Sequence, residues 1–231
     1  MRHKRQDENF FSALMARLAP IYHPPPPPTD ALELILRENI GYLIDEARRS
    51  SLFDEFRSRV GVTAKAIAQA REEILLDIAK RGGMRPDQRV ERWRRIAGIV
   101  LAQPGGDLAA HLRTLPVAKA RALLKQFPSI GDPGADKILL LAGLDARPSV
   151  DSNGLRVLVR FGVVPDRKSY AATYRAAVDL LAEASAGSRD RLVQAFLVLR
   201  EHGRSLCKRN EPRCIACPLD RVCAHARAGW F

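Results

Sequence analysis

The sequence lacks any hydrophobic run of the roughly 18–20 residues that a helix needs to cross a lipid bilayer. Its first residues, MRHKRQDENFF, mix acidic and amide side chains with basic ones, which breaks the pattern of a secretory signal peptide. No stretch of useful length alternates apolar and polar residues as a half-buried strand does. These absences exclude membrane-spanning and sheet-based classes, and they predict a cytoplasmic protein with no membrane partner.

Cysteine is scarce, and the four that occur all lie near one end of the chain. The cytoplasm keeps thiols reduced, so these cysteines are better explained as metal ligands than as two disulfides. Thiolates suit iron–sulfur clusters and zinc, and structural zinc sites more often use two separated C-x2-C pairs. Only one such pair is present here. The pattern C-x6-C-x2-C-x5-C favours an iron–sulfur cluster, with zinc or unliganded thiols as alternatives, on Cys207, Cys214, Cys217 and Cys223.

Acidic residues are outnumbered, with 26 Asp and Glu against 38 Lys and Arg, which gives a formal charge of +12 and a pI near 10.1. A protein this basic usually faces a polyanion, although a basic surface without a partner is the alternative. The loop KRNEPR between the first two cysteines carries Lys208, Arg209 and Arg213. These cations could contact DNA phosphates, or they could simply be solvated.

Helical periodicity is what the sequence has in abundance. Within residues 1–23, five apolar side chains recur at helical spacing, namely Phe10, Phe11, Leu14, Leu18 and Ile21. Five prolines, residues 24–28, follow as a stiff spacer. From there to about residue 200, apolar residues recur every three or four positions between proline and glycine breaks. The sequence therefore predicts an all-α fold of eight to ten helices.

Three segments together resemble the endonuclease III and adenine glycosylase branch of the helix-hairpin-helix (HhH-GPD) superfamily of DNA glycosylases. One is the cysteine segment HGRSLCKRNEPRCIACPLDRVC. Another, LLKQFPSIGDPGADKILLLAG, is similar to the hairpin motif L-P-G-V-G-x-K-x-A. The third, SVDSNGLRV, is similar to V-D-T-H-x-x-R-V. The resemblance covers residues 30–225. It implies a 4Fe–4S cluster on the four cysteines and a monomer that removes a damaged or mismatched base from double-stranded DNA near the nucleoid.

The same resemblance implies two helical lobes with a DNA-binding cleft between them. Residues 1–29 would form an N-terminal helix and the proline spacer. Residues 30–135 would form a helical barrel that ends in the helix-hairpin-helix. Residues 136–231 would form the cluster lobe, which packs with the N-terminal helix and contains the cysteine loop 207–223.

Asp151 is the candidate catalytic residue. Cleavage of an N-glycosidic bond builds positive charge on the sugar, and a nearby carboxylate stabilises that charge or orients a water molecule. The resemblance assigns this role to the aspartate of V-D-T-H, which is Asp151 here. The alternative is that Asp151 caps the helix that GLRVLVRFG begins, and both roles are compatible.

The sequence departs from the family at the lysine that forms a Schiff base in lyase-competent relatives, because Pro133 occupies that position. This predicts a monofunctional glycosylase that uses water. Lys137, one helical turn further on, is the alternative nucleophile of a bifunctional glycosylase and AP lyase. Two further alternatives are a non-catalytic DNA-damage-binding protein on the same scaffold and an iron–sulfur electron-transfer protein.

The remaining candidates are DNA contacts. The hairpin residues Ile130, Gly131 and Gly134 precede or begin a helix whose first amides could bind a phosphate, although an ordinary helix connection is the alternative. Met84 in the loop GGMRPDQ could act as an apolar wedge. In RENIGYL, Asn39 could meet a base edge and Tyr42 could stack on a flipped base. Loop, core or surface roles remain open for these three residues.

Overall fold

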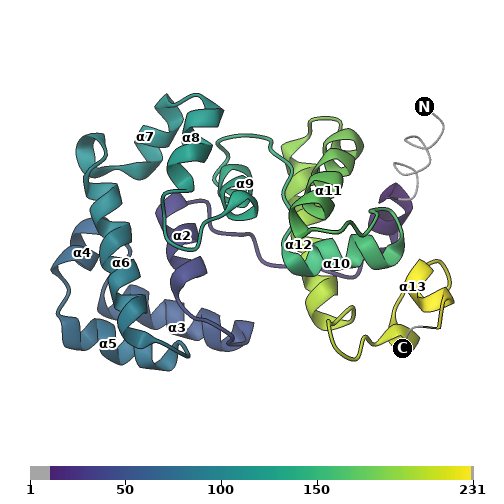
Figure 1. Ribbon diagram of the computed structural model, residues 1–231, viewed down its shortest axis with the longest axis horizontal. Coiled ribbons are helices and arrows are strands. Elements are labelled where there is room, and N and C mark those ends of the chain that lie inside the picture. Colours follow the sequence, from purple (N-terminus) through teal and green to yellow (C-terminus); the bar gives the residue numbers. More distant parts are fainter. Residues whose placement is uncertain (1–10, 230–231) are drawn as a thin grey trace. The chain divides into compact units, whose positions relative to one another are not determined.

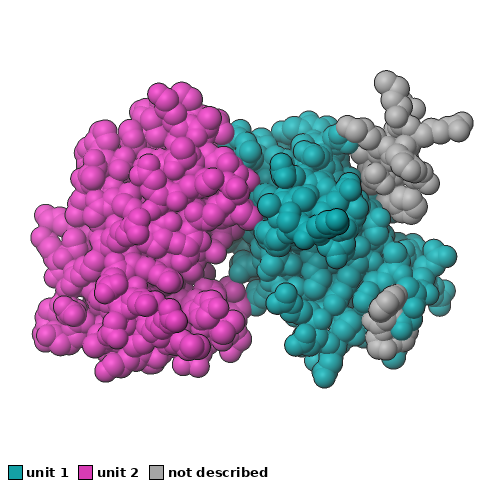
Figure 2. Space-filling model, viewed as in Figure 1, with its two compact units in different colours: residues 1–27, 145–231 teal, residues 28–144 magenta. Residues whose placement is uncertain are grey.

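The computed structural model describes residues 11–229, which divide into two units (Figure 1, Figure 2). One unit is the continuous stretch of residues 28–144, and the other combines residues up to 27 with residues from 145 onward. Throughout the described part of the chain, every regular element is a helix, so the predicted all-α class is confirmed. Phe10, part of the predicted N-terminal apolar pattern, lies outside the described residues.

The unit of residues 28–144 is a set of eight α-helices and one short 3₁₀ turn. In chain order they are α2 (Ala31–Asn39), α3 (Glu46–Arg59), α4 (Ala64–Gln69), α5 (Glu72–Arg81), α6 (Pro86–Leu101), η1 (Pro104–Gly106), α7 (Leu108–Thr114), α8 (Val117–Leu124) and α9 (Asp132–Leu141). Side chains of Asp30, Asp45, Thr63 and Asp107 accept hydrogen bonds from first-turn amides and so fix where α2, α3, α4 and α7 begin.

Trp93 of α6 is one of the largest fully buried side chains of this unit. Its ring centroid lies 4.8 Å from that of Phe56, and its indole N–H donates to the Asn39 carbonyl at 3.2 Å. The donated bond satisfies the polar edge of a large buried aromatic side chain. Trp93 thereby ties the end of α2 to the middle of α6.

The second unit joins the helical residues 11–18 to the later part of the chain. Its other elements are α10 (Ser152–Phe161), α11 (Tyr170–Ser185), α12 (Arg189–Ser205), η2 (Cys214–Ala216) and α13 (Ala224–Arg227). Leu14 and Leu18 of the first helical segment are fully buried, which shows that this segment contributes to the core of the unit.

Two glycines bring α10 and α12 into backbone contact. A Cβ atom on Gly203 would lie 2.6 Å from the Asn153 carbonyl oxygen. A Cβ on Gly154 would lie 3.2 Å from the Leu199 Cβ and 3.7 Å from the Arg200 nitrogen. Glycine at both positions therefore lets the first turn of α10 lie directly against α12.

Residues 11–229 alone contain more helices than the eight to ten predicted, because the chain ends some helices without proline or glycine. Ala70 and Arg71 alone separate α4 from α5, and both have extended backbone angles. The sequence places the domain division near residue 135, inside α9, whereas the division between the units follows residue 144. Over the described residues, no helix is both long enough and apolar enough to cross a membrane.

We expect Gly203→Ala to destabilise the unit that contains α12. The new methyl group would overlap a backbone oxygen that cannot move without displacing α10, and such overpacking costs about 1–3 kcal/mol. Gly98→Ala in α6 is the matched control, because a Cβ there meets nothing within 4 Å. That change should raise helix stability by roughly 0.5–1 kcal/mol. Thermal denaturation of both variants measures the difference, and equal melting temperatures would contradict the tight contact.

Candidate active site and cysteine pocket

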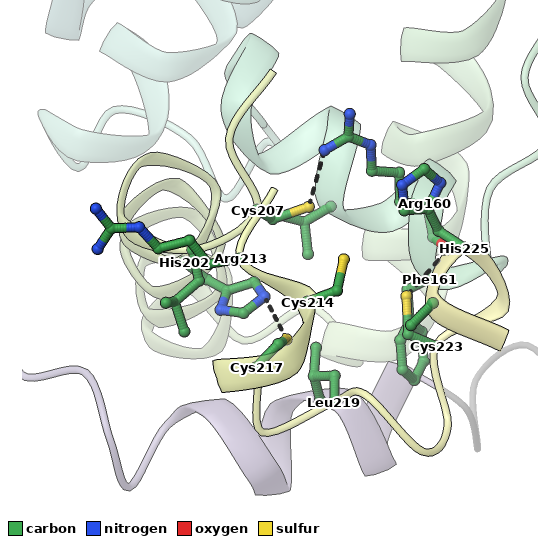
Figure 3. A pocket seen from close by; sticks show the side chains of 13 residues that line it. Arg160, Phe161, His202, Cys207, Arg213, Cys214, Cys217, Leu219, Cys223 and His225 are labelled. Carbon is green, nitrogen blue, oxygen red and sulfur yellow. Dashed lines mark hydrogen bonds between the residues drawn. The ribbon is translucent and has the colours of Figure 1, made fainter. Parts of the chain in front are cut away.

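The four cysteines line one pocket in the unit that contains α10 and α12 (Figure 3). They lie on the segment that follows α12, and their sulfur atoms point into the same space. Apolar side chains form much of the remaining wall, including Val157, Phe161 and Leu219. The sequence places these cysteines together by spacing, and the structure gives them a common enclosed surface.

Two arginines of α10 hold the cysteine loop against that helix. Arg160 donates to the carbonyls of Lys208 at 2.6 Å and Arg209 at 3.1 Å, and its guanidinium lies 3.6 Å from the Cys207 sulfur. Arg156 donates to the Cys207 carbonyl at 2.8 Å and to the Gly203 carbonyl at 2.7 Å. Burial raises the pKa of the Cys214 thiol, and the positive charge of Arg160 offsets that rise only in part.

The four cysteines are free thiols, a donor type that suits iron–sulfur clusters and zinc. Among residues 11–229, no three cysteine, histidine or acidic side chains are arranged to hold one ion. A structural zinc ion requires each sulfur to lie about 2.3 Å from one centre. Burial raises the pKa of the Cys217 thiol to about 11, so thiolate at neutral pH would need a bound cationic group.

His202 and Tyr22 add a polar edge to the pocket. The His202 Nε2 atom lies 3.7 Å from the Cys217 sulfur, and its Nδ1 atom lies 3.0 Å from the Tyr22 hydroxyl. Burial lowers the pKa of His202 to about 4, so the ring is neutral near pH 7 and carries a single N–H. This contact joins the N-terminal segment to the cysteine loop within one unit.

Asp151 caps α10, as the capping interpretation of the sequence requires. Its Oδ1 accepts hydrogen bonds from the backbone amides of Asn153 at 3.0 Å and Gly154 at 2.9 Å. Its Oδ2 lies 3.4 Å from the Asn153 side-chain amide and 3.4 Å from Arg200 Nε. The carboxylate remains 26% exposed, so capping leaves it open to solvent on one side.

Two residues beside Asp151 escape the sequence motifs. Arg200 comes from α12, where the glycine contact brings that helix to the first turn of α10. Tyr170 begins α11 and is 53% exposed; partial burial and the negative charge of Asp151 together raise its pKa. Neither residue belongs to a local pattern around Asp151, because both reach it through tertiary packing.

The left-handed residue of the hairpin before α9 is a serine that lies two positions before Gly131. Ser129 has φ of 62°, in the left-handed region, at the position where the family motif has its first glycine. Gly131 has φ of −93°, which any residue can adopt, and a Cβ there would meet only Pro133 Cδ, at 4.0 Å. The backbone therefore does not require glycine at position 131. Because Gly131 has no side chain, the space at the start of α9 stays open.

The first turn of α9 explains how the chain tolerates Pro133 in place of lysine. Proline fits early helical positions because the amide it lacks has no partner within the helix. Asp132 lies beside it and pairs with Lys125 at 2.7 Å and Arg121 at 2.9 Å. These two cations offset a carboxylate that would otherwise oppose a phosphate at the helix start.

Ile130 and Gly134 pack against each other at the hairpin, and Lys137 lies further along α9. Ile130 is 5% exposed, and its side chain lies 3.4 Å from the position of a Cβ on Gly134. Lys137 forms an ion pair with Glu38 of α2, and its side chain is 14% exposed. Attack on a sugar by Lys137 would require it to leave this carboxylate.

Three exposed apolar side chains gather on two adjacent loops of the unit of residues 28–144. The Tyr42 amide donates to the Gly82 carbonyl at 2.9 Å, which joins the loop after α2 to the loop before α6. Tyr42 is 58% exposed, Leu43 80% and Met84 63%. Leu43 is absent from the sequence-based candidates, and its φ of 55° holds it in the left-handed region.

Arg89 supports the Met84 loop from below. It is 4% exposed and donates to the carbonyls of Ala79 at 2.6 Å and Met84 at 3.0 Å. These two hydrogen bonds from one buried guanidinium fix the path of the backbone between Ala79 and Met84. The loop therefore presents Met84 from a rigid base.

Asn39 and the basic loop differ in accessibility. Asn39 is 4% exposed, and its side-chain amide donates to the carbonyls of Ile35 and Pro128, so it links α2 to the hairpin. Contact with a base edge would require Asn39 to leave that position.

The basic loop between the first two cysteines is more accessible. Arg209 and Arg213 are exposed and Lys208 is half-buried, and Arg160 holds the loop backbone.

The comparisons with known proteins agree with this arrangement. No family model matches the chain. It is 26% identical over 174 residues to the thymine-DNA glycosylase of Aeropyrum pernix, covering 75% of this chain and 73% of that protein. It is 28% identical over 182 residues to endonuclease III of Thermotoga maritima, covering 79% and 75%.

Solved structures establish the fold. A thermostable thymine-DNA glycosylase superposes with a TM-score of 0.76 at 16% identity, over 97% of this chain and 98% of that one. Endonuclease III in a trapped covalent intermediate with DNA also gives a TM-score of 0.76, at 17% identity over 99% of both chains. The predicted resemblance is confirmed for the fold by these matches and in sequence by the two relatives.

Replacement of Arg89 by leucine should loosen the Met84 loop. The change leaves two carbonyls without their donor, and an unsatisfied buried polar group costs about 1–3 kcal/mol. Hydrogen exchange of amides in residues 82–86 should become faster. Arg92→Leu, on the exposed side of α6, is the control and should leave those amides unchanged. Equal protection in both variants would show that Arg89 does not hold the loop.

Proposed function

We propose that this chain is a DNA glycosylase of base-excision repair. Its fold and its sequence are both similar to those of endonuclease III. It would hydrolyse the N-glycosidic bond of a damaged or mismatched base in double-stranded DNA. The observation that carries this proposal is the Asp151 carboxylate, which is fixed at the start of α10 and remains partly open to solvent. The relation to a thymine-DNA glycosylase and to endonuclease III supports it.

Asp151 would supply the electrostatic part of the reaction. The sugar gains positive charge as the bond to the base lengthens, and a fixed carboxylate stabilises that charge without reorganising. Oδ1 is committed to the two amides of α10, so Oδ2 is the oxygen that can face the sugar or orient the attacking water. The electron pair of the C–N bond would leave with the base, which takes up a proton from solvent. The attacking water would lose a proton to Oδ2 or to solvent as the new C–O bond forms.

The absence of lysine at position 133 favours a monofunctional enzyme. A Schiff base needs a free amine at the sugar, and Pro133 provides none. Lys137 is engaged with Glu38, so a bifunctional reaction would first have to break that ion pair. With water as the nucleophile, the product is an abasic site in an uncut strand.

DNA binding would use surfaces in each unit. In residues 28–144, the open start of α9 offers amides to a phosphate, and Tyr42, Leu43 and Met84 offer apolar side chains for an opened base stack. In the other unit, Arg209 and Arg213 would add phosphate contacts. One monomer supplies all of these groups.

We also propose that Cys207, Cys214, Cys217 and Cys223 hold a 4Fe–4S cluster. The four sulfurs share one pocket, and Arg160 places positive charge near Cys207. When bound, such a cluster would tie the loop after α12 to α10 and supply no chemistry to base release. The proposed role is therefore to orient the basic loop and stabilise its unit.

Asp151→Asn should abolish base release and keep DNA binding. Asparagine retains the shape and the capping ability of aspartate but removes the charge that stabilises the sugar cation. The loss should be at least about 100-fold in single-turnover rate, on the scale of other electrostatic catalytic groups. The assay uses duplexes that each carry one altered base, beginning with a mismatched thymine, followed by alkali. Unchanged rates would remove Asp151 from the chemistry.

The same duplexes separate water from lysine as the nucleophile. Strand breaks should appear only after alkali, and borohydride should trap no protein–DNA adduct. An adduct that forms with the unchanged protein and vanishes in Lys137→Ala would show that the enzyme is bifunctional. If no duplex in the panel loses a base, the chain is a DNA-binding protein on a glycosylase scaffold.

The cluster proposal predicts a yellow-brown protein with about four irons per chain and a broad visible absorption. Cys214→Ser should lower the iron content and yield unstable or insoluble protein, because ligand loss frees the loop after α12. Metal analysis and thermal denaturation measure both effects. One zinc per chain and no colour would contradict the proposal.

A further inference from the structure

We infer that His202 donates a hydrogen bond to the metal-bound sulfur of Cys217, and that Tyr22 holds the His202 ring in the orientation for this bond. The inference rests on the proposed metal site at the cysteines and on no step of base release. His202 is 1% exposed. Its Nε2 atom lies 3.7 Å from the Cys217 sulfur, and its Nδ1 atom lies 3.0 Å from the Tyr22 hydroxyl (Figure 3).

The chemistry of a metal ligand determines which atom carries the hydrogen in the contact between His202 and Cys217. A cysteine sulfur that binds a metal has given up its proton, so it can only accept a hydrogen bond. The hydrogen between the two side chains therefore belongs to Nε2 of His202. An imidazole with its one hydrogen on Nε2 accepts at Nδ1, and the Tyr22 hydroxyl is a donor within reach of that atom.

Ser205 leaves the hydrogen of the Tyr22 hydroxyl free to point at His202. The Ser205 hydroxyl donates to the Glu201 carbonyl at 2.8 Å, so its oxygen meets the Tyr22 hydroxyl, at 3.2 Å, as an acceptor. Tyr22 thus has one hydrogen and two acceptors, and Nδ1 is the nearer of them. The rings of Tyr22 and His202 also meet edge to face, with centroids 5.7 Å apart, which fixes the plane of the imidazole.

The backbone of His202 contacts the start of the cysteine loop. Its carbonyl accepts from the Cys207 amide at 2.9 Å, while its ring reaches Cys217. One buried residue of α12 therefore contacts two of the proposed ligands. Partners of this kind orient metal ligands, and their replacement weakens metal binding by about 10- to 100-fold.

Tyr22 connects this contact to the first helical segment. Its amide donates to the Leu18 carbonyl at 3.2 Å, and Leu14 and Leu18 are fully buried in the same unit. A coupling between two sites is reciprocal, so a contact that strengthens the metal site also strengthens the packing of residues 11–22. Metal retention and the packing of this segment are therefore coupled through Tyr22 and His202.

Two amide side chains of different length test the donation by His202. The measurement is the rate at which a chelator removes metal from the purified protein. His202→Asn should release metal about 10-fold faster, because its N–H group lies near the position of Nδ1 and does not reach the sulfur. His202→Gln should stay within about 3-fold of the unchanged protein, because its longer side chain brings an N–H group near the position of Nε2. Equal release from the two variants overturns the donation.

Tyr22→Phe tests the orienting role with little risk to the fold, because it removes only the hydroxyl. Release should be about 3-fold faster, and in a His202→Asn background the same change should add less than about 1.5-fold. Ser205→Ala is the matched control, since it removes the other neighbour of that hydroxyl and should leave release unchanged. A rate in Tyr22→Phe equal to that in Ser205→Ala overturns the role of Tyr22.

Hydrogen exchange measures the coupling to the first helical segment. In the unchanged protein, chelation should speed exchange of the amides in residues 11–22 and leave those of α6, in the other unit, unchanged. In Tyr22→Phe, exchange in residues 11–22 should be faster before chelation and should respond less to it. An equal response to chelation in the two proteins overturns the coupling.

Metal analysis of the unchanged protein separates this inference from the cluster proposal. A protein that carries zinc would overturn the cluster, and the same release measurements would still test His202, because a zinc-bound thiolate also lacks a proton. A protein that holds no metal would overturn both proposals. None of these measurements needs DNA or turnover, so they fail or succeed independently of the proposed glycosylase activity.

Discussion

The close contact between α10 and α12 at Gly154 and Gly203 determines the geometry of both candidate sites in its unit. Because the two backbones touch, Arg200 reaches the carboxylate at the start of α10. The same approach lets Arg156 bind the Gly203 carbonyl and the first residue of the cysteine loop. A single larger side chain at this contact would shift the acid, its counter-ion and the pocket wall together.

The sequence predicts the residues that local spacing determines and misses those that tertiary packing brings together. The all-α class follows from apolar periodicity, and the cysteine pocket and the cap at Asp151 follow from short motifs. Arg200 could not be predicted, because it lies 49 positions from Asp151 and no pattern links them. The burial of Asn39 could not be predicted either, because the sequence alone does not tell whether a polar residue in an apolar helix is buried or exposed.

The hairpin shows how a motif can keep its shape while its residues change. Serine replaces the first glycine in a left-handed conformation, which costs backbone energy that glycine would avoid. Proline replaces lysine at a helix position where its missing amide carries no penalty. Asp132 adds a negative charge that Lys125 and Arg121 balance. The hairpin thus keeps its helix start without the amine used by lyases, and the phosphate contact that we propose there would not need that amine.

The discontinuous unit has a consequence for how the chain folds during its synthesis. The contact between Tyr22 and His202 spans 180 positions, and at 5–20 residues per second the first partner waits roughly 10–40 seconds for the second to leave the ribosome. The intervening unit of residues 28–144 is continuous and can fold during that wait. The partners of the early segment in α12 emerge only after that unit, so Leu14 and Leu18 cannot reach their buried positions until α12 has been synthesised.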